Sequence, residues 1–166
     1  NQRDEGREVY GSRLEKISAN NLPVIVSNSL PGKDAIIKKV GISKNKIKII
    51  NNGIVIPEQV EPSIDWKKEL NLPEQSLIVS MLASIYKYKD HKTLLKAWAI
   101  VQQSLKNETL RPVLILAGTF KGMENELKVV CYDLRIADSV YFIGATLNTN
   151  TLIEQSSLVV HSSNKE

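Results

Sequence analysis

The chain has 166 residues, of which 42% are hydrophobic and 24% are charged, as in ordinary soluble globular proteins. No apolar run approaches the roughly 18 residues that a membrane span needs, and the charged N-terminus carries no signal-peptide pattern. The single cysteine, Cys131, excludes an intramolecular disulfide and so gives no argument for secretion. We therefore expect a cytoplasmic protein of one domain, or of one domain plus part of another.

The net charge of +4 is unevenly distributed. Residues 1–52 contain ten Lys or Arg and five Asp or Glu, whereas the remainder contains twelve and thirteen. Five of the lysines are clustered: Lys38, Lys39, Lys44, Lys46 and Lys48. They indicate either a face for anionic lipid or nucleic acid, or a solvated helix end and strand edge, which we favour. No aromatic residues alternate with these lysines, so we expect no nucleic-acid partner, while peripheral contact with a membrane stays open.

The first 53 residues show helix and strand patterns in alternation. The expected elements are a helix over 7–20, a strand over 23–27, a helix between Ser29 and Gly41, and a strand over 46–50. Ser29 is the predicted N-cap, with Pro31 in the first turn, and Gly41 the predicted end of that helix. Residues 51–53 are expected to form a turn in which Gly53 can adopt a positive φ.

Residues 54–75 differ in composition from the segments on either side of them and are predicted to form a linker. Pro57, Pro62 and Pro73 are half of the six prolines in the chain. One short helix is expected over 63–70, with Ser63 as its N-cap. This stretch is the best candidate for a domain boundary, which divides the chain into 1–53, 54–75 and 76–166.

From residue 76 onward, strands and helices alternate regularly. Strands are predicted over 77–82, 113–117, 139–143 and 157–160, and helices over 91–106, 122–134 and 149–155. The strands are almost continuously apolar, as in a parallel sheet covered on both faces, so the expected fold class is α/β with right-handed crossovers. Because the chain stops directly after the last strand, we expect it to be a piece of a longer protein.

The sequence lacks a dinucleotide fingerprint, a Walker A loop and a Cys/His metal cluster. Candidate site residues instead follow the predicted strands, at 84–89, 118–119, 144–146 and 161–166. Carboxyl ends of parallel strands share one edge of the sheet. There a ligand would meet Lys89 or Lys87, glycine turns and the carboxylate of Glu166. This combination favours a phosphorylated small molecule with hydroxyl groups.

Each candidate also has a purely structural interpretation. Lys89 fits a solvated loop lysine, and Glu166 alone is a terminal charge. Gly118 and Gly144 fit ordinary turn glycines as well as ligand contacts. Two further side chains, Cys131 and Trp98, are expected in the core. His91, in a first helical turn, is expected at the surface rather than as a base.

Five segments, in chain order, resemble group 1 (family 4) glycosyltransferases. They are VIVSNSLPGKDAIIKKVGISKNKIKIINNGI, ASIYKYKDHKTLLKAW, VLILAGT, SVYFIGAT and LIEQSSLVVHSSNKE. The second is similar to the family's GR-L-x-x-x-K-G/D opening of the second domain, and the last to its P-S-x-x-E segment. Each match is weak alone, but the ordered set covers nearly the whole chain.

The resemblance implies the GT-B fold, made of two facing Rossmann-like domains. Residues 1–53 would then end the acceptor domain, and 76–166 would form most of the donor domain. It implies a retaining transferase that needs no metal or other cofactor. The enzyme would transfer a hexosyl unit from a nucleoside diphosphate sugar to a saccharide or lipid-linked acceptor, in glycan or polysaccharide biosynthesis.

Residue by residue, the resemblance assigns Lys89 to the donor diphosphate and Glu166 to the first glutamate of a Glu-x7-Glu motif near the donor sugar. Gly118, Gly144 and Ala145 would lie near the nucleotide base. A further pair, Asn52 and Gly53, would lie at the crossing between domains.

Two departures from the family pattern bear on the activity. The usual arginine beside the lysine corresponds to Ser84, or to Tyr86 in a variant spacing, so Lys87 becomes the candidate second cation. The proline before Ser162 is replaced by His161. Two alternatives stay open: another GT-B nucleotide-sugar enzyme such as an epimerase, and a non-catalytic nucleotide-binding module. The 166-residue chain alone is expected to have no transferase activity.

Overall fold

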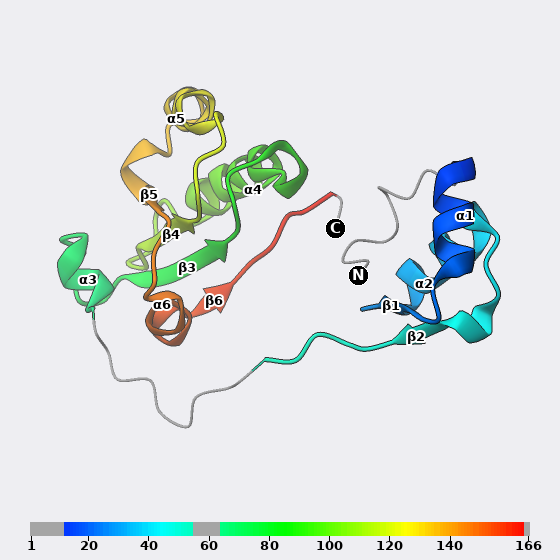
Figure 1. Ribbon diagram of the computed structural model, residues 1–166. Helices are drawn as coiled ribbons and strands as arrows, with labels where there is room; N and C mark the ends of the chain where they lie inside the picture. Colours follow the sequence, from blue (N-terminus) through cyan, green and yellow to red (C-terminus); the bar gives the residue numbers. More distant parts are fainter. Residues whose placement is uncertain (1–11, 55–63, 165–166) are drawn as a thin grey trace. The chain divides into compact units, whose positions relative to one another are not determined.

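The computed structural model describes residues 12–54 and 64–164, which fall into two compact units (Figure 1). The first unit comprises residues 12–54. The second comprises residues 64–164 and carries most of the predicted site. Residues 64–75, inside the predicted linker, pack as part of the second unit.

The first unit is a two-stranded parallel sheet with helices packed beside it. Its elements are α1 (Arg13–Asn21), β1 (Ile25–Ser27), α2 (Leu30–Val40), a 3-10 turn (Lys44–Lys46) and β2 (Ile47–Ile49). The predicted limits of α2 are confirmed: the Ser29 hydroxyl accepts from the Gly32 N–H, and Gly41 is left-handed at φ 76°. Its inner face carries Ile36 and Val40, which are buried in one cluster with Ile47.

One expectation in the first unit is wrong, and a second is tested only over the described residues. Gly53 does not adopt a positive φ, and residues 51–54 form no turn. The predicted helix over 7–20 lies partly outside the described residues; its described part begins after Ser12, which forms a capping box with Glu15. Leu14 and Ile17 of this helix are exposed.

The second unit is built on a four-stranded parallel sheet of order β5-β4-β3-β6. Its strands are β3 (Leu77–Leu82), β4 (Pro112–Ala117), β5 (Val140–Gly144) and β6 (Leu158–Val159). Its helices are α3 (Trp66–Glu69), α4 (His91–Ser104), α5 (Glu124–Asp133) and α6 (Thr149–Gln155). The predicted α/β class and parallel sheet are confirmed.

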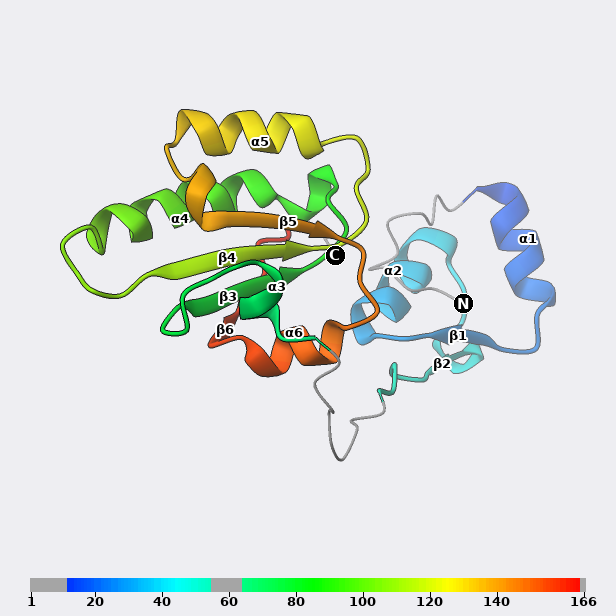
Figure 2. The same ribbon diagram turned by 90° about the vertical axis from the view of Figure 1, so that its left-hand side faces the viewer.

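Helices cover both faces of this sheet (Figure 2). On one face α4 and α5 bury Leu95, Trp98 and Leu127 against Met81 and Leu116. On the other face α3 and α6 close a second cluster, which contains Trp66, Ile78, Val113, Ile115, Ala117 and Leu152. All six residues of β4 are buried, which explains why the strands read as continuous apolar runs rather than alternating ones.

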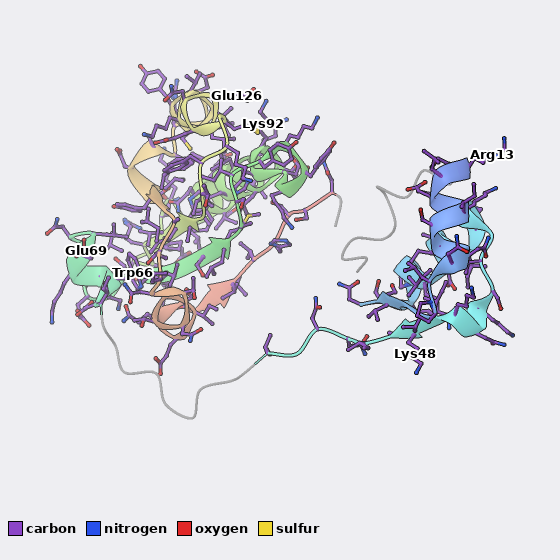
Figure 3. The ribbon with its side chains drawn as sticks, viewed as in Figure 1. Arg13, Lys48, Trp66, Glu69, Lys92 and Glu126 are labelled. Atoms are coloured by element: carbon purple, nitrogen blue, oxygen red, sulfur yellow. The ribbon has the colours of Figure 1, made fainter. Side chains whose placement is uncertain are left out.

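The α4–α5 layer confirms two predicted core residues. Trp98 is buried and its indole N–H donates to the Ser139 hydroxyl at 3.0 Å. Cys131 is 2% exposed, and burial raises the pKa of its thiol to about 11. Lys92 of α4 and Glu126 of α5 meet at the surface of this layer (Figure 3).

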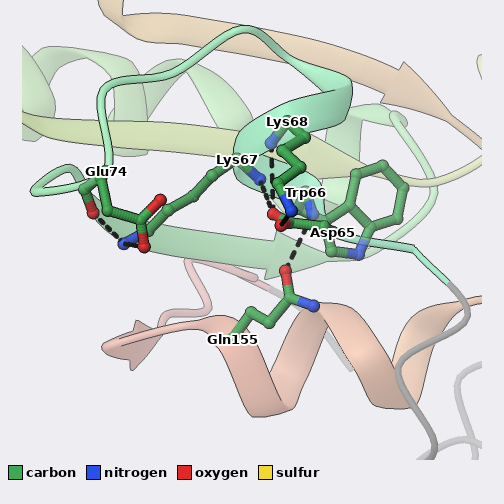
Figure 4. Close-up of polar contacts among 6 residues, drawn as sticks. All are labelled: Asp65, Trp66, Lys67, Lys68, Glu74 and Gln155. Carbon is green, nitrogen blue, oxygen red and sulfur yellow. Dashed lines mark hydrogen bonds and ion pairs between the residues drawn. The ribbon is translucent and has the colours of Figure 1, made fainter.

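The short helix α3 has a different N-cap from the predicted one, and its start is hydrogen-bonded to α6. It begins at Trp66, and the carboxylate of Asp65 caps it by accepting from Lys67 N and Lys68 N; the predicted cap, Ser63, lies outside the described residues. The Gln155 side chain of α6 accepts from Trp66 N at 2.9 Å and donates to the Ile64 carbonyl at 2.8 Å (Figure 4). These bonds hold residues 64–66 on the second unit.

Within the described parts of the chain, no helix has both the length and the apolarity to cross a bilayer.

Candidate functional site

A pocket of about 250 Å³ lies where β3, β4 and β5 end. Ser84, Gly118 and Ala145, one predicted residue from each of three separate segments, line it together. The remaining lining residues are Leu82, Ala83, Ala117, Thr119, Thr146 and Thr149. Small side chains and hydroxyl groups therefore surround a space at the edge where α/β proteins bind ligands.

Gly118 brings two of the pocket loops into close contact. A Cβ atom on this residue would lie 2.0 Å from the carbonyl oxygen of Ala83, so only glycine fits. The Gly118 N–H donates to the Gly144 carbonyl at 2.7 Å, which ties the β4 loop to the β5 loop. Gly144 is left-handed at φ 70° and lies beside the ring of Phe120. Both glycines shape the pocket through their backbones.

The loop from β3 to α4 is held firmly beside this pocket. Ile85 is fully buried, its N–H donates to the Thr119 carbonyl at 3.0 Å, and its carbonyl accepts from Lys121 N at 3.2 Å. A 3-10 turn over Lys87–Lys89 follows and leads to Asp90, which caps α4 through Thr93. The loop therefore presents its lysines from a fixed backbone.

Lys87 and Lys89 both lie on that turn, and neither is among the residues that line the pocket. Within residues 12–54 and 64–164, neither ammonium has a carboxylate within 4.0 Å. The Lys87 Nζ atom instead lies 5.0 Å from the centre of the Tyr88 ring. Two positive charges without carboxylate partners favour an anionic ligand at this edge.

The segment after β6 packs against the same turn. The Ser162 hydroxyl lies 3.0 Å from the Lys89 carbonyl and 3.1 Å from that of Asp90, and Asn164 N donates to the Tyr88 carbonyl at 3.1 Å. Glu166, the predicted carboxylate of this segment, lies outside the described residues. Asn52 and Gly53 belong to the first unit.

His91 is the clearest correction to the sequence-based expectations. It was expected at the surface, but it is 2% exposed at the start of α4. Neither ring nitrogen has a hydrogen-bond partner. Burial lowers the pKa of the imidazole; the charges of His161 and Lys89 act in the same direction, and Asp90 opposes them. The buried imidazole therefore gives up its proton more readily than a free histidine does.

A second, larger cavity of about 730 Å³ lies at the other end of the sheet, between the ends of α4 and α5. Lys106, Arg111 and Arg135 line it together with Asp133. Lys106 and Arg135 follow directly after the C-termini of α4 and α5, where cations offset the negative ends of the helix dipoles. Arg111 donates to the backbone carbonyls of Glu108 and Leu110. In the described residues, no group of three His, Cys, Asp or Glu side chains is placed to hold a metal ion.

The parallel sheet, its two helical layers and the pocket at the strand ends define a Rossmann-like α/β domain. The family model described as "Glycosyl transferases group 1" matches residues 62–166. The chain belongs to this family of glycosyltransferases.

Solved structures agree on the fold. Anabaena HepE in complex with UDP and glucose superposes with a TM-score of 0.73 at 22% identity over 91% of this chain. WaaG, a glycosyltransferase involved in lipopolysaccharide biosynthesis, superposes with a TM-score of 0.71 at 18% identity over 85% of this chain. S. aureus TarM, in a complex that contains UDP, superposes with a TM-score of 0.69 at 16% identity over 91% of this chain. These likenesses show the GT-B fold.

The chain spans 41%, 38% and 27% of the lengths of these three structures. No curated protein matches it.

Proposed function

We propose that the full-length protein transfers a hexosyl unit from a nucleoside diphosphate sugar to a saccharide or lipid-linked acceptor, with retention at the anomeric carbon, in glycan or polysaccharide synthesis. The observation that carries this proposal is the loop that runs from the hydroxyl-lined pocket and bears Lys87 and Lys89, neither of which has a carboxylate partner among the described residues. The bound UDP of HepE and TarM supports a uridine donor.

In this proposal each part of the strand-end edge has one role. The base and ribose lie by Gly118, Gly144 and Ala145, where glycine backbones allow close approach. Ser84 and the two lysines face the diphosphate. As the glycosidic bond to the diphosphate breaks, negative charge grows on the leaving group, and fixed cations stabilise that charge more than the ground state.

Glu166 has the role that its resemblance implies, which is to orient the donor sugar. The first unit, with Asn52 and Gly53 at the domain crossing, contributes to the acceptor side. No metal ion or other cofactor is part of the proposal, because the lysines offset the diphosphate charge.

The test is calorimetric titration of UDP, GDP and ADP, and of their glucose conjugates where available, into the full-length protein. Lys89→Ala should weaken nucleotide binding by at least about tenfold, the loss expected for a charged hydrogen bond. Lys96→Ala, an exposed lysine on α4, is the matched control and should bind like the parent. Equal affinity of the Lys89→Ala variant and the parent would refute the assigned role.

A non-catalytic nucleotide-binding module is the second candidate, because Ser84 stands where the resembling transferases have an arginine. This alternative predicts saturable nucleotide binding without hydrolysis of, or transfer from, any donor sugar. An epimerase would instead interconvert free nucleotide sugars without an acceptor. Following the donor by chromatography, with and without mixed saccharide acceptors, separates the three outcomes.

A further inference from the structure

Tyr88 makes a contact with its neighbour Lys87 that the local backbone does not dictate. The two residues are consecutive in a 3-10 turn, and consecutive side chains of a helical turn diverge. Nevertheless the Lys87 Nζ atom lies over the Tyr88 ring, 5.0 Å from its centre. At this separation the negative face of the ring attracts the ammonium group.

The ring that holds Lys87 is itself held in place. Tyr86 packs on Tyr88 edge to face, with 5.3 Å between ring centres and 83° between planes. The Tyr88 carbonyl accepts from Asn164 N, and the Tyr86 carbonyl accepts from Lys89 N at 2.9 Å. Backbone and ring contacts therefore fix Tyr88 from both sides of the turn.

Holding Lys87 has a consequence for anion binding. A solvated lysine has a flexible four-carbon stem and loses much rotamer freedom when it grips a ligand. A contact with an aromatic ring restricts the lysine stem before the ligand binds. It leaves the ammonium group able to bind a carboxylate or a phosphate. The ammonium hydrogens that point away from the ring stay available to phosphate oxygens.

We propose that Tyr88 is a positioning residue, which holds the Lys87 ammonium ready for the donor diphosphate through the face of its ring. The inference rests on the proposed function, since it assumes that an anionic nucleotide binds at this loop. Tyr88 is not among the site residues predicted from the sequence. Its aromatic ring, rather than its hydroxyl group, holds the Lys87 ammonium.

The experiment is a double-mutant cycle on nucleotide affinity in the full-length protein, using whichever of UDP, GDP and ADP binds tightest. Tyr88→Leu should weaken binding two- to fivefold, which corresponds to about 0.5–1 kcal/mol for an exposed cation–π contact. Tyr88→Phe keeps the ring and should bind like the parent. In a Lys87→Met background, Tyr88→Leu should have no further effect, whereas in a Lys89→Met background its effect should persist.

A second measurement needs no nucleotide. In NMR spectra, the ε-methylene protons of Lys87 should be shifted upfield by the ring of Tyr88, and the shift should vanish in Tyr88→Leu but remain in Tyr88→Phe. An unshifted Lys87 signal in the parent would overturn the inference.

The outcomes separate this inference from the proposed function. If Lys89→Met weakens binding but Tyr88→Leu costs the same with and without Lys87, the positioning role is wrong and the donor site stands. If the parent protein binds none of the three nucleotides, the proposed function fails, and the NMR result then decides only whether the ring holds the lysine.

Discussion

The hydroxyl of Ser162 lies 3.0 Å from the backbone carbonyl of Lys89, and so joins the segment after β6 to the lysine turn that follows β3. The same hydroxyl lies 3.1 Å from the Asp90 carbonyl, so its single proton is shared between the two oxygens. One side chain therefore ties together two loops that are distant in sequence and that both contribute to the proposed donor site.

Removing this tie should affect stability and donor affinity together. Ser162→Ala should lower the free energy of unfolding by about 1 kcal/mol, the usual net value of one hydrogen bond, and weaken nucleotide binding severalfold because the lysine turn loosens. Ser163→Ala is the control, since the Ser163 hydroxyl contacts His161 within its own segment. Urea denaturation and calorimetry give the two readouts; unchanged nucleotide affinity would show that Lys89 is held without Ser162.

Gly118→Ala should be severely destabilising. The new methyl group would lie 2.0 Å from the Ala83 carbonyl oxygen, and the backbone would have to move to admit it, at a cost of about 3 kcal/mol. Gly122→Ala separates this clash from backbone strain: Gly122 is left-handed at φ 80°, but a Cβ atom there meets open space. It should cost only about 1 kcal/mol. Equal costs for the two variants in urea denaturation would contradict the clash.

Gln155→Ala should loosen the N-terminal segment of the second unit. The buried N–H of Trp66 would lose its acceptor, and the Ile64 carbonyl would lose its donor. An unsatisfied buried group costs about 1–3 kcal/mol. Asn150→Ala, at an exposed position of the same helix, should be close to neutral. Hydrogen exchange at Trp66 N should accelerate in the first variant alone; equal protection in both would count against the fastening role.

Stability should fall as the pH is lowered through the range where histidine titrates. The pKa of His91 is lowered in the folded protein, so the unfolded chain binds a proton more readily. His91 therefore contributes its full stability above about pH 6.5, and this contribution is lost as the pH falls toward and below the folded pKa. The groups that act on it are His161, Lys89 and Asp90.

The check is urea denaturation at pH 8 and at pH 5 for the parent, His91→Gln and His161→Gln. His91→Gln should flatten the difference between the two pH values. His161→Gln should reduce it only in part, because His91 still titrates but no longer faces the His161 charge. A parent protein as stable at pH 5 as at pH 8 would show that the buried imidazole does not control stability.

Local sequence was sufficient to predict the limits of an element where the whole element is packed in the core. The strand predicted over 77–82 is β3 with the same limits, because its apolar residues contact helical layers on both faces. Ser29 and Gly41 were found as helix limits because capping depends on a few neighbouring atoms. Parallel pairing followed from the strand–helix alternation and is present in the three ladders described in the second unit.

Local sequence failed where a distant segment decides the environment. His91 appears polar and exposed in its own helix, but tertiary packing buries it. Thr149 lines the pocket although it begins a helix rather than following a strand, so a search of strand ends could not find it. The contact of Trp66 N with the Gln155 side chain of α6, 89 residues away in sequence, could not be found from local sequence either.

The central place of β3 also governs the order in which the unit can be assembled. On one side β3 pairs with β4, and on the other Val79 pairs with Leu158 of β6, which is the last strand to be synthesised among the described residues. A ribosome must therefore translate almost the whole of this unit before the second edge of β3 is occupied. Contacts so remote in sequence slow folding, and until they form the nascent chain presents an open, apolar strand edge to which chaperones can bind.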